Sequence, residues 1–579
     1  MTRRIVALCA AGALVSACGA PADPVDLLLV NANVHTLAWA DPSADGTPAP
    51  DAPFATATGW RADAEAIGVR DGRIVFVGAR EDAGPLEAGA GEVIDLDGAT
   101  VVPGLIDSHV HVAELGATLE RVNLVGVETE ADAIARVVER ARQVPKGDWI
   151  VGWGWDEGAW ANRYPDMTAL SAQVPDHPVA LRGLHGFAVW CNRLAFERAG
   201  ITAATTTPAG GEIRKDRRGN PTGIFVNTAR TLVEAAMPEP TPAQLDARIL
   251  RGLDAMAQAG YVSVHEAGAD AAILESLQRL EAANRLPIRV YAMLAARDEP
   301  LLRAWLARGP DRDHDGMLAT RSVKAFDDGA LGSRGARLME DYSDQPGHRG
   351  VSGAGYGFDQ ALVADMMKAG FQVGVHAIGD AGNRETLDFF EQVFAGRPDT
   401  RDGRHRIEHA QVLHPDDIPR FASLGIIASM EPAHAVEDMP WAEARVGPER
   451  ITGAYAWRSL RLAGARLAFN SDMPGSDYGV FYGLHAAITR RGKDLRPEGG
   501  WYPAQVMAAE EALRGYTAWG AYAAFEEEVA GIVGPGRRAD LTVMSLDPLG
   551  VGSTSPDDLL GGHVVMTIVA GRVVFRATR

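Results

Sequence analysis

The middle of the chain contains short apolar runs that end in polar residues, and these runs alternate with stretches of helical periodicity. Residues 371–380 ("FQVGVHAIGD") are one such run, and the amphipathic stretch 383–395 ("NRETLDFFEQVFA") follows. This alternation predicts parallel βα units. Eight runs of this kind occur, at 100–109, 261–268, 288–294, 321–329, 371–380, 404–410, 425–432 and 466–472. Because a TIM (β/α)8 barrel needs eight βα units, we expect an α/β fold with this barrel over residues 101–529.

Both ends of the chain show a different pattern, with short strand-like segments separated by tight turns. The turns "RDGR" and "AGRV" each join two β-rich segments. The segments lie at 25–36, 64–80, 92–98, 539–548 and 564–577. We therefore expect residues 25–100 and 530–579 to form one composite β-sandwich from both termini.

The gap between the first and second predicted barrel strands is far longer than a loop. About 150 residues separate the two strands, whereas a βα loop usually has about 2–6. The gap holds helical stretches and the tryptophan-rich segment 148–160 ("DWIVGWGWDEGAW"). We expect an insert at about 125–255, a lid or subdomain over the mouth of the barrel. Trp155 is a candidate for an aromatic wall of the pocket, and simple packing within the insert is the alternative.

The first 24 residues read as a processing segment. Two arginines precede an apolar run from Ile5 to Val15, which is typical of a secretory signal. The following "VSAC" resembles a bacterial lipobox with Cys18 as the lipidated residue; a plain signal peptide is the alternative. We expect residues 1–18 to be a lipoprotein-type signal peptide and 19–24 a tether. The protein would then be secreted across the bacterial inner membrane as a periplasmic or cell-envelope lipoprotein, with membrane contact only through Cys18.

Composition excludes several classes of function. The net charge of −20 argues against nucleic-acid binding, because phosphate backbones attract basic surfaces. No internal stretch reaches 18 uninterrupted apolar residues, so no internal transmembrane helix is expected. Cys191 is the one cysteine beyond residue 18, which rules out an intramolecular disulfide framework and a cysteine-based metal site in the mature chain.

The stretch "DSHVH" ends the first predicted barrel strand and carries His109 and His111. Alternate side chains of a strand share a face, so both imidazoles would point the same way. Two buried histidines side by side are costly unless they are satisfied, and a metal ion satisfies them. Barrel active sites lie at the carboxyl ends of the strands. Further residues with suitable chemistry lie at or near those ends: Lys324, His376, His409 and Asp472.

Five sequence blocks carry a resemblance to a known family. In chain order they are "PGLIDSHVH", "VKAFDDGALGSR", "HAIGD", "RIEHAQ" and "NSDMPG". They resemble the signature blocks of the amidohydrolase superfamily, and more closely its YtcJ-like branch (amidohydrolase family 3), which includes N-substituted formamide deformylase. The resemblance runs from about residue 25 to the C-terminus. It implies a site for one or two Zn²⁺ ions, or another divalent transition metal, built by His109, His111, Lys324, His376, His409 and Asp472.

The resemblance also implies a modified lysine. A lysine that burial and nearby cations deprotonate can add carbon dioxide, and the resulting carbamate offers two oxygens to bridge two metal ions. Lys324 would carry that carbamate. The alternative is a structural ion pair between Lys324 and Asp327 or Asp328.

The implied activity is that of a metal-dependent hydrolase of the EC 3.5 class, acting on a non-peptide C–N bond in an amide, formamide or cyclic amide. Zinc would lower the pKa of a bound water to about 7, and the hydroxide would attack a polarised carbonyl. Asp472 would move the proton to the leaving nitrogen, and His409 or His376 would stabilise the oxyanion. Two alternatives stay open: an ester or carbamate hydrolase on the same site, and a non-catalytic periplasmic binding or regulatory protein on the same scaffold.

The expected partner is a small amide-like molecule, and a homodimer is left open. Arg334 follows the fourth strand and would hold a carboxylate or carbonyl of the substrate. His434 follows the seventh strand and His265 ends the second. A purely structural role is the alternative for each of these three residues. Residues 185–187 read "HGF" where the family often has "DGH", so substrate contacts cannot be carried over there.

Overall fold

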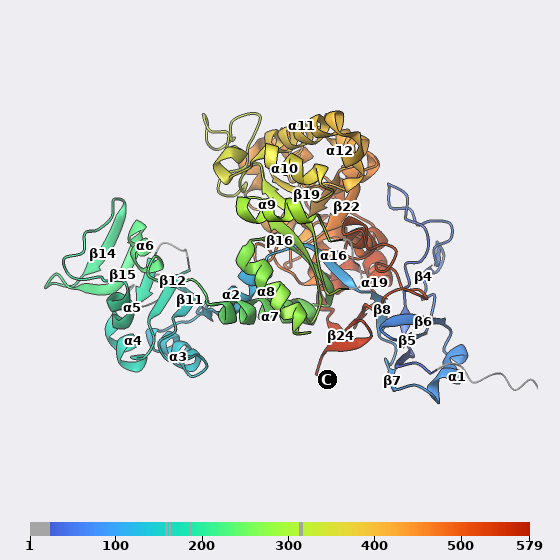
Figure 1. The fold of residues 1–579 in the computed structure, drawn as a ribbon, viewed down its shortest axis with the longest axis horizontal. Helices are drawn as coiled ribbons and strands as arrows, with labels where there is room; N and C mark the ends of the chain where they lie inside the picture. Colours follow the sequence, from blue (N-terminus) through green and yellow to red (C-terminus); the bar gives the residue numbers. More distant parts are fainter. Residues whose placement is uncertain (1–23, 157–159, 161–163, 185–187, 312–315, 579) are drawn as a thin grey trace, which may run out of the picture.

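The computed structural model describes residues 24–578 apart from four short segments, 157–159, 161–163, 185–187 and 312–315. The predicted signal peptide with its lipobox Cys18, and the tether up to residue 23, lie outside the described residues. Within the described residues, no helix combines the length and the apolar character needed to cross a membrane. Figure 1 shows a central barrel with the insert on one side and the terminal sheets on the other.

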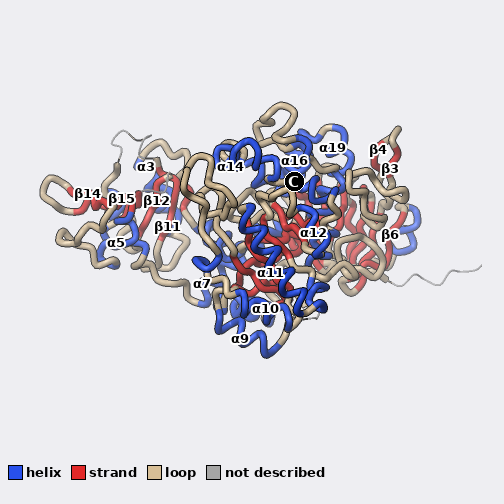
Figure 2. The backbone as a smooth tube through the Cα atoms, turned by 90° about the horizontal axis from the view of Figure 1, so that it is seen from above, coloured by secondary structure: helices blue, strands red, loops and turns tan. Residues whose placement is uncertain are grey.

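Eight parallel strands form the barrel, which confirms the predicted fold class. The sheet closes where the residues after the last strand meet the first: the Asp472 amide donates to the His109 carbonyl at 2.9 Å and the His111 amide donates to Met473 at 2.9 Å. Figure 2 shows helices outside the central strands. In sheet order the strands are β9 (Leu105–Val110), β16 (Tyr261–Ala269), β17 (Arg289–Ala295), β18 (Leu318–Phe326), β19 (Gln372–Ala377), β20 (Arg406–His409), β21 (Ile427–Met430) and β22 (Arg466–Phe469).

The helices of the barrel begin at recognisable capping residues. Thr241 and Gln244 form a capping box at the start of one helix, with Pro242 at its first position, and the Asp270 side chain caps the next. Their apolar faces join the strands in one large hydrophobic core. The helices are α2 (Val112–Glu120), α7 (Pro242–Gln258), α8 (Ala271–Ala282), α9 (Glu299–Arg308), α10 (Gln360–Lys368), α11 (Asp380–Gly396), α12 (Ile418–Leu424), α13 (Pro432–Asp438), α14 (Ala442–Arg450), α15 (Trp457–Leu462), α16 (Val480–Thr489), α17 (Ala509–Gly515), α18 (Ala518–Ala523) and α19 (Pro548–Thr554).

The first predicted strand, 100–109, is two strands in two different sheets. Strand β8 (Thr100–Pro103) pairs with strands of the terminal region, and β9 begins at Leu105 in the barrel. Gly104 lies at the break, where a Cβ atom would be 2.4 Å from Val262 Cγ2 and 2.9 Å from the Asp540 carbonyl oxygen. Only a glycine lets the chain pass between the two sheets at this distance.

Two small sheets at the ends of the chain share one hydrophobic cluster, which contains Leu29, Ile67, Val101, Leu541 and Ile568. Residues from both termini therefore build a common core. The four-stranded sheet has the order β6 (Arg73–Gly78), β5 (Ala66–Arg70), β1 (Leu27–Val30), β7 (Glu92–Asp95). The five-stranded sheet has the order β2 (Asn33–Val34), β8, β23 (Leu541–Met544), β24 (Val564–Val569), β25 (Arg572–Arg576).

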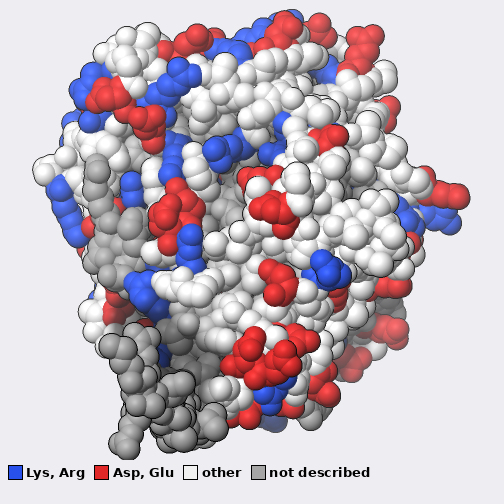
Figure 3. Space-filling model, turned by 90° about the vertical axis from the view of Figure 1, so that its right-hand side faces the viewer, with Lys and Arg blue, Asp and Glu red and all other residues white. Residues whose placement is uncertain are grey.

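Figure 3 shows the side of the molecule that carries the terminal sheets. Acidic and basic side chains are interspersed over this face, with one denser group of acidic residues in its lower part. On the described part of this face, the negative charge of the chain is spread and not gathered in one large patch.

The insert is a six-stranded sheet with its own helices. Its two hydrophobic clusters contain only insert residues, from Val122 to Met237, and Figure 1 shows it projecting beside the barrel. The predicted boundary at 255 falls within α7, which packs on α2 of the barrel, so the insert elements end earlier than expected. The strands, in chain order, are β10 (Val122–Asn123), β11 (Ile150–Trp155), β12 (Val179–Gly183), β13 (Ala188–Cys191), β14 (Gly211–Lys215) and β15 (Pro221–Asn227); the helices include α3 (Glu130–Ala141), α4 (Met167–Gln173) and α5 (Arg193–Arg198).

Helices α2 and α7 cross at two glycines. A Cβ atom on Gly116 would lie 1.9 Å from the Arg248 carbonyl oxygen, and one on Gly252 would lie 2.2 Å from the Val112 carbonyl oxygen. Residue numbers therefore rise along one helix as they fall along the other, so the two helices run antiparallel. The insert leaves the barrel at the end of α2 and returns at the start of α7, next to its point of departure.

Candidate metal centre

The carboxyl ends of the barrel strands bring the predicted metal residues together. His109 lies on β9, Lys324 on β18, His376 on β19 and His409 at the end of β20, and these four are buried. Direct contacts link them: the His109 and His409 rings are 5.1 Å apart between centroids, and the His376 and His409 rings 4.5 Å apart. The arrangement brings side-chain nitrogens from separate strands together at the mouth of the barrel.

The tightest group consists of His109, His111 and Asp472. One candidate ligand atom from each lies within 4.8 Å of the others. Asp472 Oδ1 is 3.6 Å from His109 Nε2 and 3.4 Å from His111 Nε2. Two imidazoles and one carboxylate are a donor set that suits zinc. Burial raises the pKa of Asp472, but the hydrogen bond to His111 and the histidine charges outweigh it and hold that pKa well below its usual range.

Lys324 points into the same group. Its Nζ lies 3.1 Å from His109 Nε2 and 4.3 Å from the centre of the Phe326 ring. Burial lowers the pKa of Lys324 to about 8, although the carboxylates of Glu408 and Asp472 act in the opposite direction. A neutral amine is therefore accessible to this side chain near neutral pH.

The alternative ion pair of Lys324 is absent among the described residues, where no ion pair joins it to Asp327 or Asp328. The Asp328 carboxylate instead accepts hydrogen bonds from the backbone amides of Ile378 at 2.9 Å and Gly379 at 2.8 Å. Asp328 therefore fixes the turn that follows His376, and its Oδ1 lies 3.5 Å from His376 Nε2.

His376 and His409 differ in their electrostatic surroundings. Burial, His409 and Lys324 together lower the pKa of His376 well below its ordinary value. Burial also acts to lower the pKa of His409, but Glu431, whose Oε1 lies 3.2 Å from His409 Nδ1, raises it above the ordinary value. The buried Nε2 of His376 has no hydrogen-bond partner in the structure. An unsatisfied buried nitrogen is costly, and a metal ion at this place would remove that cost.

Left-handed backbone conformations occur at two of these residues. His409 has φ 74° and Asp472 has φ 49°. Such values are rare outside glycine and cluster at functional sites. Alternation along β20 would send Glu408 and His409 to opposite faces. The unusual backbone at His409 lets both side chains contact His109, Glu408 by a hydrogen bond and His409 through its ring.

Two further buried acids lie next to the histidines, and the sequence pattern did not identify them. Glu408 Oε2 lies 2.7 Å from His109 Nδ1, and Glu266 Oε2 accepts a hydrogen bond from the Val112 amide at 2.7 Å. Burial raises the pKa of Glu408, but the Arg406 guanidinium outweighs it and holds that pKa well below its usual range. In the sequence, "RIEH" places an acid directly before a candidate ligand. Without the fold, however, Glu408 cannot be distinguished from an ordinary surface glutamate.

Two of the four predicted substrate contacts do not reach the mouth. His265 is fully buried, and its Nδ1 accepts a hydrogen bond from Arg406 at 2.9 Å. Trp155 is fully buried in the core of the insert, where its indole donates to the Leu181 carbonyl at 2.7 Å. Simple alternation would put Trp153 and Trp155 on one face of β11, but a β-bulge with Gly154 at φ 99° lies between them, and Trp153 is 38% exposed while Trp155 is buried.

The other two predicted contacts are partly exposed after barrel strands, Arg334 in the loop after β18 and His434 in α13 after β21. Arg334 pairs with Asp344 through Nε at 3.1 Å and Nη2 at 2.8 Å. His434 Nε2 lies 3.4 Å from Asp438 Oδ2, which also accepts a hydrogen bond from the Tyr455 hydroxyl at 2.7 Å. Both side chains thus have protein partners, and a substrate would have to share or displace them.

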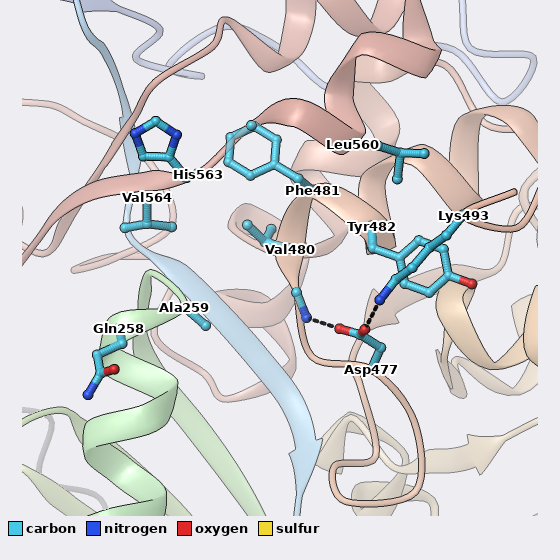
Figure 4. Close-up of a pocket in the computed structure, with 12 residues that line it drawn as sticks. Gln258, Ala259, Asp477, Val480, Phe481, Tyr482, Lys493, Leu560, His563 and Val564 are labelled. Atoms are coloured by element: carbon cyan, nitrogen blue, oxygen red, sulfur yellow. Dashed lines mark hydrogen bonds and ion pairs between the residues drawn. The ribbon is translucent and has the colours of Figure 1, made fainter. Parts of the chain in front are cut away.

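A separate cavity of about 510 Å³ lies between α7, α16 and the start of β24 (Figure 4). Phe481, Val564 and the Asp477–Lys493 ion pair contribute to its lining. None of the predicted metal residues lines it, so this cavity is distinct from the metal centre.

Comparison with known proteins agrees with this geometry. The chain matches the amidohydrolase family over residues 92–575. It is 30% identical to the putative amidohydrolase YtcJ of Bacillus subtilis (strain 168), across 88% of this chain and 96% of that protein. It is 27% identical to N-substituted formamide deformylase of Arthrobacter pascens, across 96% of this chain and 99% of the enzyme.

A solved structure is similar over nearly its whole length. The crystal structure of an uncharacterized metal-dependent hydrolase from Pyrococcus horikoshii OT3 superposes with a TM-score of 0.69 at 26% identity, covering 90% of this chain and 98% of the other. The predicted resemblance is thereby confirmed. The strand-end histidines, the barrel that presents them and the match over most of the chain lead to one conclusion: the chain belongs to the amidohydrolase family.

Proposed function

We propose that the protein is a metal-dependent hydrolase that cleaves a non-peptide C–N bond in an amide, formamide or cyclic amide. The observation that carries the proposal is the cluster of His109, His111 and Asp472, whose candidate ligand atoms lie within 4.8 Å of one another at the barrel mouth. Family membership supports metal-dependent hydrolysis, and similarity to N-substituted formamide deformylase over 96% of the chain favours the C–N bond.

The residues present fit a divalent metal. His109, His111 and Asp472 would hold one ion, and Lys324, His376 and His409 supply the donors for a second. When bound, zinc lowers the pKa of a coordinated water and polarises a substrate carbonyl. The unsatisfied Nε2 of His376 is consistent with a ligand role.

Asp472 is placed to move the proton. Its Oδ1 lies 3.6 Å from His109 Nε2 and 3.4 Å from His111 Nε2, and its side chain is 20% exposed. That carboxylate accepts a proton from the attacking water and delivers it to the leaving nitrogen as the C–N bond breaks. If the site holds a single ion and His409 does not bind metal, its imidazole, whose protonated form Glu431 favours, would donate to the carbonyl oxygen as negative charge develops there.

We also propose that Lys324 carries a carbamate. The neutral amine adds to carbon dioxide: a C–N bond forms as one C=O π bond breaks and leaves its electron pair on oxygen, and one proton passes from the nitrogen to water. Burial and the absence of an ion-pair partner among the described residues favour the neutral amine that this addition requires. The anion that results would place two oxygens next to His109, His376 and His409.

The test starts from purified protein that lacks residues 1–18. Elemental mass spectrometry measures metal per chain, and a panel of formamides, amides, cyclic amides, esters and carbamates measures hydrolysis before and after chelation. We expect one or two equivalents of zinc or a similar transition metal and chelator-sensitive cleavage of the amide-type substrates. Exclusive cleavage of esters or carbamates would correct the bond type. Folded protein that takes up no metal when zinc is supplied would overturn the proposal in favour of a binding or regulatory protein.

A further inference from the structure

A buried charged pair lies directly beneath the metal centre. Arg406 and Glu408, two residues apart on β20, are both fully buried inside the barrel. Arg406 Nε donates to Glu408 Oε1 at 2.7 Å and Nη2 donates to Oε2 at 2.8 Å. Glu408 Oε2 also lies 2.7 Å from His109 Nδ1. The three side chains form a continuous chain from the barrel interior to a candidate metal ligand.

The hydrogen-bond directions in this chain determine the tautomer of His109. A guanidinium has only donors, so both oxygens of Glu408 accept from Arg406. The proton between Glu408 and His109 must then come from His109 Nδ1. The Nε2 atom is left with its lone pair, and it faces Lys324 Nζ at 3.1 Å and Asp472 Oδ1 at 3.6 Å. A metal ligand needs this tautomer and this orientation.

All three guanidinium nitrogens of Arg406 donate hydrogen bonds. Its Nη1 donates to His265 Nδ1 at 2.9 Å, and its Nη2 donates to the Ser108 carbonyl at 2.5 Å. The Ser108 carbonyl belongs to the strand that carries His109, so the guanidinium ties β20 to β9. These contacts also account for His265, which accepts from Arg406 and is buried among the barrel strands.

A glycine on the neighbouring strand leaves room for the carboxylate. A Cβ atom on Gly374 of β19 would lie 2.5 Å from Glu408 Oε1 and 2.6 Å from Met293 Cε. Both distances are shorter than any Cβ contact tolerates, and Gly374 has no unusual φ that would require glycine for another reason. The space that the Glu408 carboxylate occupies therefore depends on a glycine of β19 as well as on β20.

We propose that Glu408, oriented by Arg406 and accommodated by Gly374, is a positioning residue that fixes His109 with Nε2 toward the metal. The inference rests on the proposed function, because it assigns a purpose to a residue that would not touch metal or substrate. Carboxylate partners of metal-binding histidines typically contribute about 10–100-fold to metal affinity.

The substitution Glu408→Gln tests whether Glu408 determines which nitrogen of His109 carries the ring proton. The amide oxygen of the new side chain would still accept from Arg406, so its NH₂ group would face His109. His109 Nδ1 would then have to accept, which moves the ring proton to Nε2 and blocks the ligand lone pair. We expect about 10–100-fold weaker zinc binding in competition with a chelator. In metal-free protein, the ¹⁵N shifts of His109 should change from the Nδ1–H to the Nε2–H tautomer.

The variant Gly374→Ala provides a second route, because it displaces the carboxylate while Glu408 and Arg406 both remain; it should weaken zinc binding in the same direction. Glu510→Gln is the matched control. Glu510 is a buried carboxylate paired with Arg514 at 2.8 Å and Trp39 at 2.7 Å, and it makes no contact with the metal residues. It should lose stability but keep the zinc affinity of the parent.

The outcomes separate this inference from the proposed function. A parent protein that binds no zinc contradicts the proposed function. In that case the tautomer of His109, compared between metal-free parent and metal-free Glu408→Gln, still tests whether Glu408 positions the ring. A parent that binds zinc, with Gly374→Ala and Glu408→Gln both within about twofold of it, overturns the inference. If Glu408→Gln does not fold, Gly374→Ala decides by itself.

Discussion

Two of the histidines at the candidate metal centre have Nδ1 against a buried carboxylate. His109 meets Glu408 at 2.7 Å, and His409 meets Glu431 at 3.2 Å. His376 differs, because the nitrogen that lies 3.5 Å from Asp328 is Nε2, the atom without a hydrogen-bond partner. Buried charges need such pairing, and the pairing also restricts how each ring can turn. The metal centre is thus shaped as much by the acids behind the histidines as by the histidines.

The substitution Asp472→Asn should abolish turnover while the fold is retained. An amide cannot accept the proton of the attacking water, and loss of general acid–base catalysis typically costs about 10²–10⁴-fold in rate. We expect kcat to fall by this factor, measured by steady-state hydrolysis, with cooperative thermal unfolding preserved. Asp477→Asn is the control, since Asp477 pairs with Lys493 outside the centre. Parent-like activity in Asp472→Asn would remove this residue from the mechanism.

His405 should make stability depend on pH between about 4 and 6.5. It is buried, accepts from the Val373 amide at 3.0 Å and lies 2.9 Å from the Thr400 carbonyl, and burial lowers its pKa to about 4. In this range the unfolded chain binds more protons than the folded one, so the free energy of unfolding falls as pH falls, by at most about 1.4 kcal/mol per unit. Urea unfolding across this range measures the slope.

The variant His405→Asn provides the comparison for that slope. Its side chain does not titrate, so the difference in unfolding free energy between parent and variant should shrink from pH 6.5 toward pH 4. A difference that stays constant with pH would show that His405 does not bind the proton in question.

The sequence was sufficient to identify the candidate metal residues, which stay a prediction, and insufficient for the side chains that surround them. His109 and His111 stand out because two histidines at the end of an apolar strand are costly to bury unless a partner such as a metal ion satisfies them. Glu408 does not stand out, since its role depends on Arg406, on a glycine of another strand and on the left-handed backbone at His409. None of these is visible in periodicity. Trp155 shows the reverse error, because aromatic enrichment cannot tell a buried face from an exposed one.

At the level of elements, apolar runs with polar ends located all eight barrel strands. The failure at 100–109 has a specific cause. A continuous apolar run carries no sign that Gly104 passes within contact distance of Val262 and Asp540, and this close passage is what divides β8 from β9. The end of the insert was misplaced for a related reason, since α7 is an ordinary amphipathic helix in sequence and only its packing on α2 assigns it to the barrel.

The α2–α7 crossing should be sensitive to a single methyl group. In Gly116→Ala the new Cβ would meet the Arg248 carbonyl oxygen at 1.9 Å, so the helices must separate. We expect a loss of about 2–3 kcal/mol in unfolding free energy, measured by denaturant titration. Gly396→Ala is the control: it lies in α11 with nothing within 4 Å of the new atom, and its effect should stay below about 1 kcal/mol. Equal effects of the two variants would contradict the close crossing.

At the scale of the whole molecule, the insert has hydrophobic cores of its own, whereas the barrel core also includes residues of the terminal sheets such as Met544 and Val569. The terminal sheets share one cluster, the insert has two of its own, and the barrel with its helices has the largest. The metal residues all come from the barrel, at positions both before and after the insert in sequence. The insert therefore interrupts the first βα unit without supplying any of the six predicted ligands.

This organisation predicts that the barrel folds and binds metal without the insert. Because α2 and α7 run antiparallel, the end of α2 lies near the start of α7, and Glu120 pairs with both Arg248 at 2.9 Å and Arg251 at 3.0 Å. A loop of about five glycine and serine residues in place of 122–240 should span the gap, as helix connections of about 2–8 residues do. We expect a monodisperse protein with a cooperative unfolding transition and the zinc content of the parent, measured by size-exclusion chromatography, circular dichroism and elemental mass spectrometry. Aggregated or metal-free protein would show that the insert is integral to the barrel, in which case its two clusters are not the independent units that their residue content indicates.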